Sequence, residues 1–158
     1  MEFSNISSIL GDLMLVSVNK YWDLDVTAIS LIYETEKLQD LLCDIGSSLK
    51  YHNGRIFFWQ VEGEYVSALR TEPYEDGYLL FGLQTRKVCR HRGYGTQLVL
   101  AVCSQIQRDS KKPVYVHIEK KNIASIKLHR NIGFQICAEY GKLIDGTVSH
   151  RYYTFTYK

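Results

Sequence analysis

The order of apolar and polar residues near the start of the chain changes its period at Gly11. Residues 3–20 begin with apolar side chains at helical spacing, and the change of period favours a short helix followed by a strand at residues 13–18. Residues with helix-capping chemistry then predict two further helices. These run from Asp25 or Thr27 to Tyr33 and from near Thr35 to Gly46 or slightly later, before a loop at residues 51–54.

From Arg55 onward the hydrophobic pattern has a period of two, which is typical of strands. The pattern predicts an antiparallel series joined by tight turns at Glu62-Gly63 and at residues 73–77. The expected strands cover residues 56–61, 65–71 and 78–85.

The second half of the chain alternates helices with strands. A basic loop at residues 86–94 leads into a helix at 95–109, and Pro113 introduces a strand at 114–119 in which Tyr115, His117 and Glu119 share one face. The remaining expected elements are a helix at 122–132 ended by Gly133, a strand at 134–140, a turn at Asp145-Gly146 and a closing strand at 150–157. This order predicts an α/β (α+β) sandwich with a single mixed sheet, and one domain that spans residues 1–158.

Composition narrows the class of protein. A chain of 158 residues, 46% hydrophobic and 23% charged, is typical of one globular domain. The net charge of +2 gives little support for nucleic-acid binding. The four cysteines are widely spaced, which argues against a zinc site or a disulfide framework. The chain has no apolar run of membrane-spanning length and no basic segment before its first apolar residues, so we expect a cytoplasmic protein without a membrane partner.

The loop that joins the strand at 78–85 to the helix at 95–109 has the composition of an anion site. It reads Arg90-His91-Arg92-Gly93-Tyr94-Gly95-Thr96, so basic side chains and two glycines precede a helix N-terminus. Free N–H groups and a partial positive charge at such a terminus bind phosphate or diphosphate. An ordinary surface turn has the same ingredients, and the third glycine of a dinucleotide fingerprint and the lysine of a P-loop are both missing.

Together with the next helix, this loop resembles the acetyl-CoA signature of the GNAT N-acetyltransferase superfamily. Arg90, Gly93 and Gly95 match the form Q/R-x-x-G-x-G/A, and Asn122 follows Gly95 by 27 positions. Asn122 in turn begins a match to N-x-x-S-x-x-L-Y-x-x-x-G-F that includes Ser125, Leu128, Gly133 and Phe134. The resemblance covers about residues 56–157 and combines a loop, a spacing and a second motif.

The resemblance implies the GNAT acyltransferase fold, a single mixed central sheet flanked by helices. In it the strands at 78–85 and 114–119 form a parallel pair that splays apart to hold acetyl-CoA. No metal is expected. The resemblance implies that the backbone near 83–85 pairs with the pantetheine arm, that the loop holds the diphosphate and that the second helix contacts the arm. The implied cofactor-binding residues are Leu83, Gln84, Thr85, Arg90, His91, Arg92, Gly93, Tyr94, Gly95, Thr96, Asn122, Ser125 and His129.

Acetyl transfer to an amine requires loss of the amine proton, polarisation of the thioester carbonyl and a proton for the departing thiolate. The resemblance implies a backbone N–H of Gln84 or Thr85 as the polarising donor. The chain departs from the family at both side-chain positions. His129 stands where the family has Tyr, and His117 stands where a Glu is common. Because imidazole titrates near neutral pH, we expect His117 as general base and His129 as general acid, with Glu119 as the alternative base.

The sequence leaves two other functions open. A catalytically reduced GNAT domain would bind CoA or a partner without turnover, and a GNAT toxin would acetylate aminoacyl-tRNA. The acceptor amine, on a small molecule or on a peptide or protein, is not specified by any motif. Aromatic side chains at Trp22, Tyr33, Tyr51 and Tyr74 are candidates to line its pocket, although aromatics more often lie in the core. The tyrosine-rich last strand is a candidate sheet edge for a homodimer.

Overall fold

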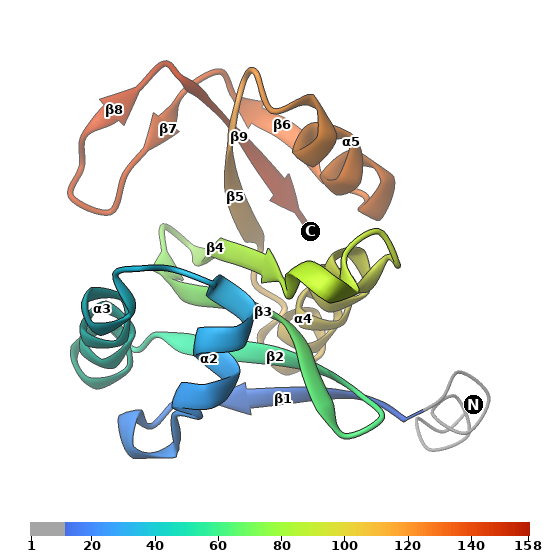
Figure 1. The fold of residues 1–158 in the computed structure, drawn as a ribbon. Helices are drawn as coiled ribbons and strands as arrows, with labels where there is room; N and C mark the ends of the chain where they lie inside the picture. The colour runs from blue at the N-terminus through green and yellow to red at the C-terminus, as the bar shows by residue number, and fades with distance from the viewer. Residues whose placement is uncertain (1–11) are drawn as a thin grey trace.

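The computed structural model describes residues 12–158, which form a seven-stranded sheet in the order β1-β2-β3-β4-β5-β9-β6 (Figure 1). The strands are β1 (Leu13–Val18), β2 (Arg55–Val61), β3 (Glu64–Tyr74), β4 (Gly77–Thr85), β5 (Val114–Glu119), β6 (Gln135–Ala138) and β9 (Tyr152–Tyr157). The helices are α2 (Val26–Tyr33), α3 (Leu38–Tyr51), α4 (Tyr94–Ser110) and α5 (Ile123–Ile132), with short 3-10 turns η1 (Tyr21–Asp23) and η2 (Lys87–Cys89). Neighbouring strands are antiparallel except for β4 and β5. The predicted mixed sheet with one parallel pair is confirmed.

Helices α2 and α5 begin at residues whose side chains cap them, Asp25 and Asn122. Asp25 accepts a hydrogen bond from the Ala28 N–H at 2.9 Å, and Gly133 ends α5. Helix α3 does not end near Gly46 but continues to Tyr51. Burial of Leu49 after Gly46 extends the helix, because packing of an apolar face outweighs the weak helix propensity of one glycine. The helix expected before residue 11 lies outside the described residues.

The strands differ from the expected bounds at their ends. Strand β3 runs to Tyr74 and includes Pro73, so the turn to β4 contains only Glu75 and Asp76. Strand β6 is shorter than the predicted 134–140. The chain then forms a small hairpin of β7 (Gly141–Lys142) and β8 (Val148–Ser149) around the predicted Asp145-Gly146 turn. We refer to residues 141–149 as the β7–β8 hairpin.

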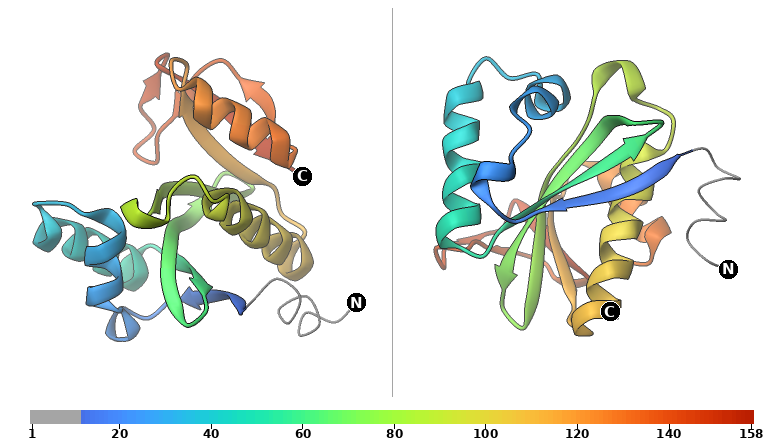
Figure 2. Two further views of the ribbon diagram at one scale, coloured as in Figure 1. Left: turned by 45° about the vertical axis from the view of Figure 1, so that its right-hand side comes forward. Right: turned by 90° about the horizontal axis from the view of Figure 1, so that it is seen from below.

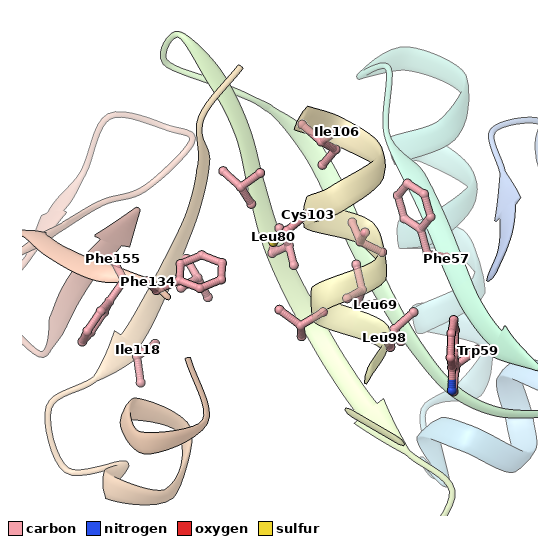
Figure 3. Packing of buried hydrophobic residues seen from close by; sticks show 14 of the residues in the cluster. Phe57, Trp59, Leu69, Leu80, Leu98, Cys103, Ile106, Ile118, Phe134 and Phe155 are labelled. Atoms are coloured by element: carbon pink, nitrogen blue, oxygen red, sulfur yellow. The ribbon is translucent and has the colours of Figure 1, made fainter. Parts of the chain in front are cut away.

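Helices cover both faces of the sheet, as the right-hand view in Figure 2 shows for α3 and α4. Alternating side chains of β2 separate the two cores: Phe57 packs beneath α4, whereas Ile56 and Phe58 pack beneath α2 and α3. Figure 3 shows the larger core, in which Leu98 and Cys103 of α4 meet Leu69 and Leu80 of the sheet. Phe134 and Phe155 extend this core to the far side of β5.

The sheet opens between β4 and β5. Their parallel register covers only Tyr78 to Leu80 opposite Val114 to Val116, and β5 continues with β9 as its partner. Figure 3 shows the two strands diverging. The expectation that the last strand is a sheet edge is wrong, because β9 pairs with β5 on one side and β6 on the other. Beyond the splay, β5 is therefore held in an antiparallel group with β9 and β6.

Candidate functional site

The splay between β4 and β5 leads into a cavity of about 540 Å³. Its walls come from both strands, from Val99 on α4 and from the first two turns of α5. The lining is mainly apolar, and its polar side chains are His117, Asn122, Ser125 and His129. These four residues were all expected at the site from the sequence.

A second hollow, of about 420 Å³, lies over the glycine loop and the start of α4. It contains nine of the expected cofactor-binding residues: Leu83, Gln84, Thr85, Arg90, His91, Gly93, Tyr94, Gly95 and Thr96. Leu83 and Leu128 line both hollows, so the two form one continuous groove. Arg92 is exposed beside the groove and does not line it.

The loop presents backbone amides to the second hollow. Gly93 occupies the N-cap position of α4 with a φ of 80°, a left-handed conformation that favours glycine. Among the described residues, no side chain caps the first turn of α4, so its leading N–H groups stay available. A Cβ added at Gly95 would lie 3.5 Å from Thr85 Oγ1, which shows how closely the helix start approaches the end of β4. Free amides at a helix N-terminus beside Arg90 and His91 fit a diphosphate.

The end of β4 directs part of its backbone into the groove. The Arg86 N–H donates to the Val66 carbonyl of β3 at 2.8 Å. Because peptide groups alternate in direction along a strand, the backbone of Thr85 faces away from β3. Arg90 Nε donates to the Thr85 carbonyl at 3.0 Å and thereby ties the loop to the strand. This alternation favours Thr85 over Gln84 as a donor on the groove side.

Asn122 caps α5 and also lines the cavity. Its side-chain oxygen accepts a hydrogen bond from the Ser125 N–H at 3.1 Å. An N-cap residue projects beyond its helix, so the rest of the amide group is available to a molecule in the groove. Ser125, one turn along α5, lies in the same wall.

His129 is buried on α5, and its ring makes an edge contact with Phe134 at 5.2 Å between centroids. Its Nδ1 lies 2.8 Å from the carbonyl oxygen of Ser125. A carbonyl only accepts, so Nδ1 carries the proton and Nε2 of the neutral ring carries a lone pair. Burial lowers the pKa of His129, and the hydrogen bond to Ser125 opposes this only in part. The resting ring is therefore a neutral proton acceptor.

His117 lines the cavity from β5, but both of its ring nitrogens have protein partners. Nε2 lies 3.1 Å from the Lys142 carbonyl of the β7–β8 hairpin, and Nδ1 lies 3.0 Å from Thr154 Oγ1. Tyr74 donates to the same Lys142 carbonyl at 2.7 Å and packs edge-on against the His117 ring. Burial lowers the pKa of His117, and the bond to Lys142 raises it less strongly. The structure thus connects this residue to the hairpin.

Glu119, the alternative base, and two glutamates that precede β4, Glu72 and Glu75, all have other partners. Glu119 lies beyond the cavity lining and accepts from Arg151 at 3.4 Å. Glu72 accepts a hydrogen bond from Ser48 at 2.6 Å, and Glu75 pairs with Lys142 at 3.4 Å. The structure therefore does not bring Glu119 together with the histidines at the groove.

Sequence reasoning missed two features of the site. One is the β7–β8 hairpin, whose Lys142 carbonyl contacts both His117 and Tyr74. The other is an irregularity in β4, where the register to β3 shifts near Gly82, a residue with a φ of 66°. A glycine inside an apolar strand is a known signal of a bulge, so Gly82 could have indicated it.

The four aromatic candidates for an acceptor pocket fall in different places. Trp22 and Tyr51 lie at the surface, 67% and 68% exposed, where lysines pack over their rings. Tyr33 contacts β4, and Tyr74 contacts the β7–β8 hairpin. Neither Trp22 nor Tyr51 lines the groove.

Residues 12–158 contain no group of three or more His, Cys, Asp or Glu placed to hold a metal ion. Over the same part of the chain, each helix is too short or too polar to cross a membrane.

Solved structures of acetyltransferases have the same fold at low identity, and some of them hold the cofactor that the groove fits. An acetyltransferase from Bacillus subtilis in complex with CoA has a TM-score of 0.67 at 12% identity, over 91% of this chain and 97% of that one. A GNAT family acetyltransferase from Elizabethkingia anophelis with acetyl-CoA bound has a TM-score of 0.63 at 12% identity, over 94% and 99%. The ribosomal-protein-S18-alanine N-acetyltransferase from Escherichia coli has a TM-score of 0.62 at 15% identity, over 91% and 90%. No curated protein sequence matches the chain.

The sequence itself matches a family. The model of the family described as FR47-like protein matches residues 62–142, more than half of the chain. This range holds β4, the glycine loop, α4, β5 and α5, which together build the groove. The chain therefore belongs to the family described as FR47-like protein, and it has the fold of the GNAT acetyltransferase structures.

Proposed function

We propose that the protein is an acetyl-CoA-dependent N-acetyltransferase that transfers the acetyl group to a primary amine by direct attack in a ternary complex. The observation that carries this proposal is the continuous groove, which leads from the amides at the start of α4 to the splay between β4 and β5. Its phosphate-binding end and its mainly apolar end match the two ends of acetyl-CoA in chemical character.

In this proposal the amides of residues 91–96 and the side chain of Arg90 bind the diphosphate. The backbone of Leu83–Thr85 and the amide of Asn122 hold the pantetheine arm, which brings the thioester to the splay. An amine acceptor then approaches from the face of the sheet that carries α2, α3 and the β7–β8 hairpin. Holding both reactants in one cleft supplies a large part of the rate enhancement.

His129 is proposed to move the proton. Attack by the neutral amine forms the C–N bond and leaves a positively charged nitrogen, whose proton passes to the free Nε2 of His129. Collapse breaks the C–S bond, and the imidazolium returns that proton to the thiolate. This keeps the expected role of general acid and adds that the proton arrives first, because the neutral ring holds its only N–H at Ser125.

His117 and Glu119, the two expected bases, are both engaged by other groups. His117 could serve as a base only after Nε2 releases the Lys142 carbonyl or Nδ1 releases Thr154. Glu119 would need to leave Arg151 and reach the splay. We therefore place His117 beside the acceptor as a group that shapes the cleft, with proton transfer at His129.

The engaged ring of His117 and the distant carboxylate of Glu119 favour a second function. A catalytically reduced domain would keep the groove and bind CoA without turnover. This function predicts binding of acetyl-CoA and CoA with no acceleration of thiol release by any amine.

Two measurements test the proposal. Calorimetry with acetyl-CoA establishes binding, and thiol release is then followed with small amines and with peptides that have free N-termini or lysines. Binding with amine-dependent thiol release supports the transferase, and the active acceptors identify the substrate class. Binding without thiol release supports the reduced domain. Absence of binding contradicts both functions.

A further inference from the structure

The end of helix α2 contacts the splayed strand at one peptide group. Tyr33, the last residue of α2, donates a hydrogen bond from its hydroxyl to the Gly82 carbonyl at 2.7 Å. The contact joins residues 49 positions apart in the chain. Burial raises the pKa of the Tyr33 phenol, so the hydroxyl keeps its proton and remains a donor throughout the neutral range.

Gly82 lies at a bulge in β4. Three steps along β4, from Phe81 to Gln84, face only two steps along β3, from Arg70 to Ala68. The Gly82 φ of 66° turns the chain at this extra residue, and the Gly82 carbonyl is directed to α2. The next residue, Leu83, lines both hollows of the groove.

The Gly82 carbonyl and the Leu83 N–H belong to the same peptide group. A trans peptide is planar, and its C=O and N–H bonds point in opposite directions. Since the carbonyl points to Tyr33 on one face of the sheet, the Leu83 N–H points to the opposite face, where α5 closes the cavity. A hydrogen bond to the carbonyl also polarises the peptide and makes its N–H a stronger donor.

Neighbouring groups hold the bulge in place. The guanidinium of the buried Arg70 lies over the Phe81 ring, 4.7 Å from its centroid, and pairs with Asp44 of α3 at 2.7 Å. A Cβ built on Gly82 would lie 3.5 Å from Arg70 Cδ and 3.6 Å from the Tyr33 hydroxyl. The bulge is therefore enclosed on the side of α2 and α3, and its peptide has little freedom to rotate.

We propose that Tyr33 is a positioning residue that fixes and polarises the Gly82–Leu83 peptide, so that the Leu83 N–H stabilises the oxyanion of the reacting thioester. This inference rests on the proposed acetyltransferase function. It replaces the donor expected from the sequence, Gln84 or Thr85, by the N–H at the bulge. It also assigns to α2 a part in the chemistry, in addition to any contact with the acceptor.

The test uses Tyr33→Phe, which keeps the ring and removes one oxygen. Tyr65→Phe is the matched control, because Tyr65 packs in the same core, stacks on Phe58 and makes no hydroxyl hydrogen bond among residues 12–158. With an active amine, we expect the kcat of Tyr33→Phe to fall about tenfold, since losing a complete oxyanion donor costs about a hundredfold to a thousandfold. The dissociation constant for acetyl-CoA should change less than twofold, and Tyr65→Phe should match the wild type.

A second readout does not require turnover. The amide ¹⁵N resonance of Leu83 in the free protein reports polarisation of the preceding carbonyl, and it should move in Tyr33→Phe and stay in Tyr65→Phe. A wild-type kcat in Tyr33→Phe would overturn the proposal, as would an unchanged Leu83 resonance or a loss confined to acetyl-CoA affinity. If the wild type acetylates no amine, the acetyltransferase function fails, and the Leu83 resonance still decides whether Tyr33 controls the peptide.

Discussion

A charge introduced at Gly93, compared with a neutral side chain of the same size, tests whether the glycine loop binds the diphosphate. Gly93 has a φ of 80°, and in the described part of the chain no residue outside its own turn places a heavy atom within 4 Å of a Cβ built on it. Asn and Asp both tolerate the left-handed conformation better than other residues with a Cβ, and they have nearly the same size. Gly93→Asn and Gly93→Asp therefore carry a similar conformational cost and differ in one negative charge.

Coulomb's law gives the expected size of that difference. A carboxylate about 5 Å from a diphosphate of about two negative charges is repelled by roughly 2–3 kcal/mol at an effective dielectric constant of about 40–80. Salt at physiological strength, with a screening length of about 8 Å, reduces this to about 1–2 kcal/mol. The Asp variant should thus bind acetyl-CoA about 5–30 times more weakly than the Asn variant.

Calorimetry with acetyl-CoA measures the four dissociation constants that are required. Gly63 supplies the control pair, because it has a φ of 82°, open space around its Cβ position and a place outside the groove. Gly63→Asn and Gly63→Asp should bind alike, and the gap at Gly93 should shrink as salt increases. Equal affinity of the Asn and Asp variants at Gly93 would refute the assignment of this loop to the diphosphate.

Three further predictions concern protons and charges. His129→Phe should lower kcat about a hundredfold or more through loss of the proton carrier, with acetyl-CoA affinity retained, as measured by thiol release and calorimetry. Because burial lowers the pKa values of His117 and His129, the unfolded chain takes up protons first as pH falls below about 6.5. The free energy of unfolding, measured with urea, should therefore decrease as the pH falls from about 6.5 to the lower pKa values of the two histidines in the folded protein. The decrease should be smaller in His129→Phe. Asp44→Asn, which leaves the buried guanidinium of Arg70 without its carboxylate, should lower the free energy of unfolding by about 1–3 kcal/mol, whereas Asp40→Asn on the exposed side of α3 should change it little.

The parts of the fold that local chemistry determines were predictable from the sequence. Period-two patterns placed the middle strands, and the Asp25 and Asn122 caps placed the starts of two helices within a residue or two. The glycine loop was predictable as a helix start because Gly93 adopts a conformation that few other residues adopt. The far end of α3 was not predictable, since it depends on which sheet surface the helix covers.

Sequence patterns do not predict the hydrogen-bond partners of single polar atoms at the site. The sequence places His117 on the same strand face as Tyr115 and Glu119, but its hydrogen-bond partners are Lys142 and Thr154, which come from the β7–β8 hairpin and from β9. Likewise, the tautomer of His129 follows from the position of a carbonyl one turn earlier in α5. These distances depend on how the elements pack against one another. Residue types alone therefore identified His117 and His129 as candidate catalytic residues but did not determine which of them transfers the proton.

The hydrogen bonds around His117 limit what that residue can do. Three contacts form a chain: Nε2 to the Lys142 carbonyl at 3.1 Å, Nδ1 to Thr154 Oγ1 at 3.0 Å, and Thr154 Oγ1 to the Tyr140 carbonyl at 2.7 Å. Three hydrogen bonds need three protons, whereas a neutral imidazole and one hydroxyl supply two. The imidazolium satisfies all three contacts, while burial opposes its charge. A neutral His117 thus leaves one of these contacts without a proton, and a proton taken from an amine would complete that contact to Lys142 or Thr154 instead of passing on to the thiolate. This is the physical reason for assigning proton transfer to His129, whose Nε2 has no carbonyl partner among residues 12–158.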